Sequence, residues 1–364
     1  MIITSRRSFL SLALSSTVAR VAWARPQRSY FDGLSFLPED LADIHKARVN
    51  AMICDISQVE TIRDPDGTPR YRRTPARNLA ELKAAIARLE NSPHAFVARR
   101  GSDIGSRSGA ATFLQFQSAE TVGSDLSRLQ KYRDLGLSVL QFTHHNNTDW
   151  AGGCLELKAS GLTPLGRDGL SEMNRLRMLV DVSHGSEATI IEAATQSRFP
   201  VVYSHGACRS IVDHPRCISD KAIRTIAQRG GVCGIFMMSF WLTRASIPTP
   251  EHWVAHIRHV IKKGGLDAVT IANDFPMSGE ADLIRLGNDN RKGVAGYLEW
   301  WRAMRRLGLP GFEQDPEHVV IPEFNAIDRV DKMERALERA RFTGREIDAI
   351  MWGNWRRVMT EVLG

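Results

Sequence analysis

The apolar and polar residues of this chain follow two recurring patterns. The first pattern is a short run rich in Val, Ile and Leu without strict alternation, which is typical of strands buried on both faces of a parallel sheet. We predict eight such strands, at Tyr30–Phe36, Val49–Ile56, Thr112–Gln117, Val139–Thr143, Met178–Ser183, Val201–Ser204, Val232–Met238 and Ala268–Asn273.

The second pattern places apolar residues three to four positions apart and predicts amphipathic helices between the strands. These helices are expected at Asn78–Glu90, Gly123–Leu135, Gly166–Leu176, Ser186–Gln196 and Ser219–Gln228. Ser219-Asp220 has the residue types of a helix N-cap, and Gly230-Gly231 is expected to end the same helix. Two further helices are predicted near the C-terminus, at Asp328–Ala340 and Thr343–Leu363.

Eight successive strand–helix units close most simply into a (β/α)8 barrel of the TIM-like type. The alternative is a doubly wound open sheet, but no Gly-x-Gly-x-x-Gly follows an early strand, as a nucleotide-binding sheet of that kind would show. Residues 282–322 are irregular and rich in Trp, Arg and Gly. We therefore predict an α/β protein with one barrel domain over residues 25–364 and an insertion around 282–322.

The N-terminus has the order of a cleaved secretory signal. The pair Arg6-Arg7 is followed by the apolar run Phe9–Ala19 and then by Ala22-Trp23-Ala24, with small residues where a signal peptidase cleaves. The paired arginines resemble the twin-arginine subtype. We expect residues 1–24 to be a signal peptide and the mature protein to be periplasmic; a surface helix with a chance Arg-Arg pair is the alternative. The apolar run is too short for a permanent membrane span.

Composition narrows the class of protein. The 364 residues are 43% hydrophobic and 24% charged, as in globular proteins. The net charge is +7, and without the first 24 residues it is +4, from 45 basic and 41 acidic residues. So small an excess does not favour nucleic acid as a partner. Five cysteines without a Cys-x-x-Cys do not indicate a disulfide framework.

Polar residues end several of the predicted strands. They are Gln117, Thr143-His144-His145-Asn146-Asn147, Asp181-Val182-Ser183-His184, Ser204-His205 and Asn273-Asp274. In a barrel all of these converge on the C-terminal rim, where the active sites of this architecture lie.

Two of these histidines suggest a metal site. His184 and His205 end successive strands and could share one ion, since imidazole is a common zinc ligand. Asp274 is either a further ligand or the base that deprotonates water. Arg216, in His214-Pro215-Arg216, offers a guanidinium for a carboxylate, with a surface salt bridge as the alternative.

Nine segments resemble, in order, the renal (membrane) dipeptidase family of zinc peptidases. They are Thr143-His144, Gly161–Gly166, Glu172–Arg175, Val180–His184, Ser204-His205, His214-Pro215-Arg216, Gly230-Gly231-Val232, Ile271–Phe275 and Gly353-Asn354-Trp355. The resemblance implies a (β/α)8 barrel with a two-zinc site that hydrolyses dipeptides. It implies that His184 and His205 are ligands of one zinc and that His144 contacts the substrate or transition state. By the same resemblance Arg216 holds the substrate carboxylate, and Asp274 works with the metal-bound water.

The family's other zinc site is altered. The family's first strand ends in Asp-Gly-His-x-Asp, but here Leu34 and Phe36 replace the two ligands, and Gln117 replaces the bridging Glu. Hydrocarbon side chains cannot coordinate a metal, and a neutral amide is a poor bridge between two dications. We therefore expect one zinc ion. Asp55 could substitute for a lost ligand, but we prefer its interpretation as a helix cap or a partner of Arg63.

The sequence thus predicts a metallohydrolase that cleaves dipeptides or related small amides. The alternative is a catalytically silent or repurposed family member that binds a small amino-acid-derived ligand. Members of the family are often dimeric, so a homodimer remains open.

Overall fold

The computed structural model describes residues 27–67 and 69–364, so the predicted signal segment 1–24 lies outside the described residues. Eight strands form a ring in the order β1-β2-β6-β7-β8-β9-β10-β11, with all neighbours parallel. Their bounds are β1 Phe31–Phe36, β2 Ala51–Asp55, β6 Ala110–Phe116, β7 Leu137–Gln141, β8 Leu179–Asp181, β9 Val202–Gly206, β10 Val232–Ile235 and β11 Val269–Ile271. All eight predicted strands are confirmed, with ends that shift by a few residues.

Three further strands lie outside this ring. β5 (Ala95–Val97) pairs with β6, and β3 (Glu60–Arg63) pairs with β4 (Pro69–Arg72) as an antiparallel hairpin. None of the three strands was predicted from the sequence, because all are short and two of them are largely polar.

The first and last strands of the ring approach each other closely. Asp274 N–H donates to the Leu34 carbonyl at 3.0 Å, and Asn273 N–H donates to the Asp32 carboxylate at 2.9 Å. A Cβ on Gly33 would lie 2.8 Å from the Ile271 carbonyl oxygen, so only glycine permits this approach. The ring is therefore a nearly closed barrel, and the open-sheet alternative is wrong.

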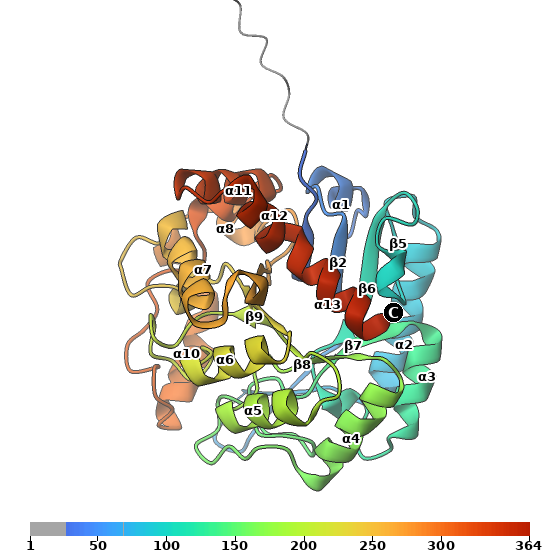
Figure 1. Ribbon diagram of the computed structural model, residues 1–364. Helices are drawn as coiled ribbons and strands as arrows, with labels where there is room; N and C mark the ends of the chain where they lie inside the picture. Colours follow the sequence, from blue (N-terminus) through green and yellow to red (C-terminus); the bar gives the residue numbers. More distant parts are fainter. Residues whose placement is uncertain (1–26, 68) are drawn as a thin grey trace, which may run out of the picture.

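Helices surround the barrel on the outside (Figure 1). They are α1 Ala42–Lys46, α2 Pro75–Glu90, α3 Ser127–Leu135, α4 Pro164–Arg175, α5 Glu187–Gln196, α6 Asp220–Gln228, α7 Pro250–Gly264, α8 Ala281–Arg285, α9 Asn290–Gly293, α10 Ala295–Arg306, α11 Arg329–Arg339, α12 Gly344–Asp348 and α13 Asn354–Leu363. The predicted cap is confirmed, since Ser219 Oγ accepts from Ala222 N–H at 3.2 Å and Gly230 follows the helix with φ +77°. The predicted helix over Thr343–Leu363 is confirmed, since α12 and α13 are joined without a break by a π-helical turn, Ala349–Gly353, whose flanking residues keep helical backbone angles.

Helix α13 closes one end of the barrel (Figure 1). Its buried Trp355 stacks on Phe31 of β1 with ring centroids 5.4 Å apart. The Arg357 guanidinium donates to the carbonyls of Gly230 and Asp267, which precede β10 and β11. Helix α13 thus closes the apolar end of the barrel, at the N-terminal ends of the strands. The polar C-terminal ends of the strands lie at the opposite rim.

Residues 282–322 contain most of α8, then α9, α10 and a long loop. Trp300 of α10 stacks on His145 at the C-terminal rim, with ring centroids 5.4 Å apart. This segment therefore reaches the rim rather than the closed end. Among the described residues, no helix has both the length and the apolar character to cross a membrane.

His256 of α7 links two loops inside the protein. Its Nδ1 accepts from Cys208 N–H at 2.9 Å, and its Nε2–H donates to the Leu242 carbonyl at 2.9 Å. These contacts require a neutral ring, and burial lowers the pKa of His256 to about 4.

This histidine should contribute to acid sensitivity. Because its folded pKa lies below the unfolded value near 6.5, its contribution to stability is complete above pH 6.5. That contribution is lost as the pH falls toward 4, by about 3 kcal/mol. We expect His256→Asn to be less stable than the native chain at pH 7.5, and this gap should narrow by about 2 kcal/mol at pH 4.5. Urea unfolding at both pH values measures it. The control is His45→Asn on the exposed face of α1, and an equal gap at both pH values would contradict the prediction.

Candidate functional site

Four histidine rings meet at the C-terminal rim. His144 and His145 follow β7, His184 follows β8 and His205 lies in β9. The His184 ring centroid lies 4.4 Å from that of His144, 4.5 Å from that of His145 and 4.9 Å from that of His205. The structure thus brings together the three histidines selected from the sequence and adds His145, whose only sequence signal is its place beside His144 at a strand end.

Unusual backbone conformations present several of these side chains. His145, His184 and Asp274 have φ values of +65°, +62° and +55°. Residues other than glycine pay on the order of 1 kcal/mol or more for this left-handed region, and such residues concentrate at functional sites. Here each one lies where a strand turns into its loop at the rim.

A buried carboxylate orients His205. Asp181 accepts hydrogen bonds from Ser183 N–H at 2.9 Å, from Ser204 Oγ–H at 2.5 Å and from Gln115 Nε2–H at 2.9 Å. Because the Ser204 hydroxyl hydrogen is used on Asp181, Ser204 Oγ must accept at 2.7 Å from His205 Nδ1–H. The tautomer of His205 follows: Nδ1 carries the proton, and Nε2 presents a lone pair to the site.

Arg216 sets the tautomer of His184 in the same way. A guanidinium only donates, and Arg216 Nη2 lies 3.0 Å from His184 Nε2, so that nitrogen is an acceptor. His184 Nε2 and His205 Nε2 are 2.8 Å apart. Both Nε2 atoms are therefore unprotonated and adjacent, and an ion shared by them would take the His184 lone pair in place of the Arg216 N–H.

This donor set fits one metal ion. Burial is the largest cause that lowers the pKa of both His184 and His205 well below 6.5, so both rings are neutral at pH 7, the form that binds zinc. A cation bound by both Nε2 atoms would remove the repulsion between their lone pairs. His144, His145 and His184 form a second grouping whose ligand nitrogens lie within 4.8 Å of one another.

The three positions that would hold the family's other zinc carry no metal-binding side chain of the expected kind. Leu34 is fully buried, Phe36 is partly buried, and Gln117 is buried with its Nε2 lacking any hydrogen-bond partner. None of the three offers an anionic ligand where the resemblance would place the other zinc.

Arg216 is held rigidly at the floor of the site. It donates from Nη1 to the Tyr203 hydroxyl at 2.7 Å and from Nη2 to the His205 carbonyl at 3.0 Å. Its guanidinium carbon lies 5.3 Å from the ring centroid of Phe236 and 5.6 Å from that of Trp241. Its buried Nε has no partner, so this N–H is available to a ligand. The surface salt-bridge alternative for Arg216 is wrong because the side chain is buried.

Two carboxyl groups at the rim have raised pKa values. Burial raises the pKa of Asp274 to about 7, against the opposing charge of Arg216. Burial likewise raises the pKa of Asp55 to about 6, against the opposing effects of Ser57 and Arg73. The predicted pairing of Asp55 with Arg63 is wrong: Arg63 Nη1 donates to Glu299 at 2.7 Å, and Arg73 is the arginine whose charge acts on Asp55.

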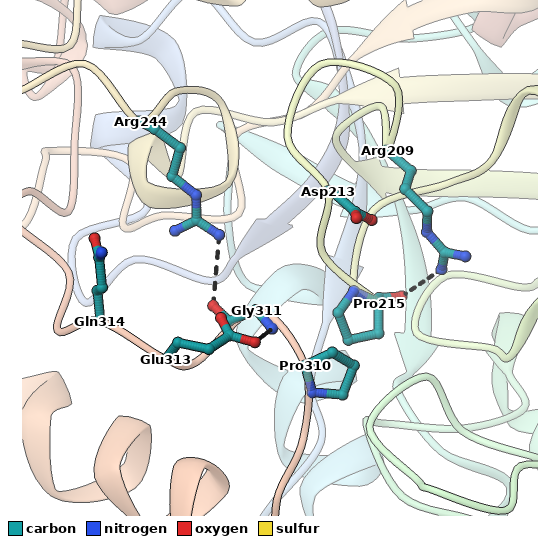
Figure 2. A pocket seen from close by; sticks show the side chains of 8 residues that line it. All are labelled: Arg209, Asp213, Pro215, Arg244, Pro310, Gly311, Glu313 and Gln314. Carbon is teal, nitrogen blue, oxygen red and sulfur yellow. Dashed lines mark hydrogen bonds between the residues drawn. The ribbon is translucent and has the colours of Figure 1, made fainter.

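A cavity of about 500 Å³ lies beside the loop that carries Arg216 (Figure 2). Arg209 and Arg244 face each other across it and donate to the carbonyls of Pro215 and Gly311. Exposed Asp213 also lines this cavity. None of the four rim histidines is in its lining, so it is separate from the histidine cluster.

Comparison with known proteins places this geometry in a family. The sequence model of "Membrane dipeptidase (Peptidase family M19)" matches residues 73–286. Dipeptidase tcpJ of Claviceps purpurea is 32% identical over 176 residues, which is 46% of this chain and 41% of that protein. The chain matches less than half of the length of each such curated relative.

Solved structures share the barrel. An amidohydrolase from Pseudomonas aeruginosa superposes with a TM-score of 0.75 at 22% identity, over 93% of this chain and 97% of that one. A metallopeptidase from Rhodobacter sphaeroides, bound to a phosphinate mimic of L-Ala-D-Ala, gives 0.71 at 16% identity, over 92% and 99%. At these identities the likeness establishes the fold, and the sequence match establishes the family. This chain therefore belongs to the membrane dipeptidase family M19, whose members are metal-dependent peptidases.

Proposed function

We propose that this protein hydrolyses the amide bond of a dipeptide or a related small amide, using one zinc ion held by His184 and His205. The observation that carries the proposal is the pair of unprotonated imidazole nitrogens that lie 2.8 Å apart. Relatives described as dipeptidases, and a barrel neighbour bound to a dipeptide mimic, support the substrate class.

The surrounding side chains have complementary roles. A zinc ion, when bound, supplies Lewis acidity toward the amide carbonyl. Asp274, with a pKa of about 7, can accept a proton from water and return it to the leaving nitrogen. Arg216 Nε–H donates to the substrate carboxylate. His144, kept neutral because burial lowers its pKa, donates an N–H to the carbonyl oxygen as negative charge develops there.

The second candidate is a silent or repurposed member that binds an amino-acid-derived ligand. It is favoured by Leu34, Phe36 and Gln117, which remove the other metal site. Both candidate functions use the same histidines and Arg216, so a measurement of substrate turnover is needed to distinguish them. We also propose, from Arg6-Arg7 and Ala22-Trp23-Ala24, that the protein is exported to the periplasm by a twin-arginine signal.

The test is Asp274→Asn assayed on zinc-loaded protein with a panel of dipeptides and of N-acyl amino acids, which carry no ammonium group. We expect kcat to fall by about 100-fold or more, the usual worth of a general base, while zinc content is unchanged. The matched control is Asp213→Asn, which removes an exposed rim carboxylate and should leave kcat unchanged. Native protein that binds zinc but cleaves no member of the panel would favour the silent alternative. Loss of zinc from Asp274→Asn would make Asp274 a ligand.

A further inference from the structure

A second buried guanidinium lies at the same rim. Arg73 follows the β3–β4 hairpin and directly precedes Thr74, the N-cap of α2. Asn78 in the first turns of α2 exchanges hydrogen bonds with the backbone of Gln58, just beyond the end of β2, at 2.8 and 3.2 Å. These bonds fix Arg73 at the C-terminal end of β2.

The Arg73 side chain is buried without a direct partner. It is 4% exposed, and its Nε has no hydrogen-bond acceptor. Among residues 27–67 and 69–364, no carboxylate oxygen is recorded within ion-pair distance of its guanidinium; Asp55 and Glu120 act on it only through longer-range attraction. A buried guanidinium without acceptors is costly, typically by several kcal/mol. Arg73 therefore has unused donors in the interior of the rim.

Arg73 stands at the end of β2, between the two strands that would carry the ligands of the family's first zinc. Its neighbour Asp55 is in register with Phe36 of β1 on one side and with Gln115 of β6 on the other. Gln117 follows on β6, and its backbone N–H donates to Ser57 Oγ at 2.7 Å. The positions that lost their metal ligands thus lie at the ends of β1 and β6, the strands on either side of β2.

Arg73 and Arg216 flank the same row of histidines. In the strand order of the barrel, β7 and β8 lie between the β2–β6 edge, which carries Arg73, and β9, whose loop carries Arg216. β7 and β8 lead directly into His144, His145 and His184. Arg73 and Arg216 thus lie at the C-terminal rim on either side of the strands that lead into these histidines.

We propose that Arg73 and Arg216 form a two-point receptor for a small amide that carries a carboxylate at each end. Each arginine has a buried Nε–H without an acceptor. The ammonium group of an ordinary dipeptide would face the Arg73 guanidinium and be repelled. Binding of such a dicarboxylate does not depend on the proposed function. Only its cleavage rests on that function.

Isothermal titration calorimetry with three matched compounds tests the receptor. N-succinyl-glycine has two carboxylates flanking an amide, N-acetyl-glycine has one carboxylate, and glycyl-glycine has an ammonium at the far end. We expect the native protein to bind N-succinyl-glycine at least about tenfold more tightly than either other compound, as for one charge-assisted contact. Arg73→Gln should reduce that preference to within about twofold and leave N-acetyl-glycine binding unchanged. Arg73→Lys should retain part of the preference.

The control is Arg72→Gln, an exposed arginine of the same hairpin, which should keep the native preference. If Arg73→Gln does not fold, the relative affinities of the native protein for the three compounds still test the receptor. Native protein that binds glycyl-glycine as tightly as N-succinyl-glycine overturns the receptor, as does a folded Arg73→Gln that keeps the full preference. Tight binding of N-succinyl-glycine without hydrolysis of any amide supports the receptor while refuting the proposed hydrolase. Hydrolysis of glycyl-glycine by a protein that shows no preference for N-succinyl-glycine supports the proposed hydrolase and refutes the receptor.

Discussion

Replacing both His184 and His205 with alanine is expected to remove bound zinc from the purified protein, from about one ion per chain to essentially none. These residues supply the two unprotonated Nε2 atoms that lie 2.8 Å apart, and no other pair of described imidazoles has its tautomers fixed in this way. Because bound metal stabilises the folded state by mass action, the native chain should also gain melting temperature on zinc addition, and the double variant should not. Elemental analysis and thermal unfolding measure the two effects.

His45→Ala is the control for this experiment, since His45 is exposed on α1, remote in sequence from the rim. It should bind zinc like the native chain. A double variant that retains the native zinc content would show that the ion is held elsewhere, with the grouping of His144, His145 and His184 as the first place to examine by single substitutions.

Asp181→Ala is expected to lower the free energy of unfolding by about 3–5 kcal/mol, the cost of removing one partner from a buried charged network. The Asp181 carboxylate accepts from the backbone of Ser183 and from the side chains of Ser204 and Gln115. Removing it leaves buried donors without acceptors, each costing about 1–3 kcal/mol. It also frees the Ser204 hydroxyl to donate to His205 Nδ1, which would move the proton of that ring to Nε2 and block zinc binding.

Urea unfolding of zinc-free protein separates the stability effect from metal binding. Asp134→Ala removes an exposed carboxylate from α3 and serves as the control, with an expected change below about 0.5 kcal/mol. If Asp181→Ala unfolds at the native urea concentration and still binds zinc, the network does not orient His205.

The eight strands were predictable because each is a compact apolar run that must be buried on both faces. The β3–β4 hairpin was not, because both strands are short, β3 is largely exposed, and neither carries an apolar periodicity. The helix predicted over Thr343–Leu363 could be found from its apolar periodicity. The π-helical turn within it, Ala349–Gly353, could not be predicted, because it changes the hydrogen bonding of one turn and leaves the run helical.

The residues of the site also divide into those that could be predicted from the sequence and those that could not. His144, His184, His205, Arg216 and Asp274 could be found from the sequence because parallel strands deliver their last residues to one rim. His145, Arg73 and the Asp181–Ser204–His205 chain of hydrogen bonds could not. Their roles depend on which neighbours are buried against them.

The sequence by itself determined the family, the barrel, and the replacement of three metal ligands by Leu34, Phe36 and Gln117, because each of these is written in residue identity and order. Only the tertiary structure decided which nitrogen of His184 and of His205 carries a proton, and that Arg73 is buried beside the positions of the lost ligands. Proton positions and charge environments depend on distances of a few ångströms between segments far apart in the chain. Hydrogen bonding and desolvation act at that range, and no local pattern of residues records it.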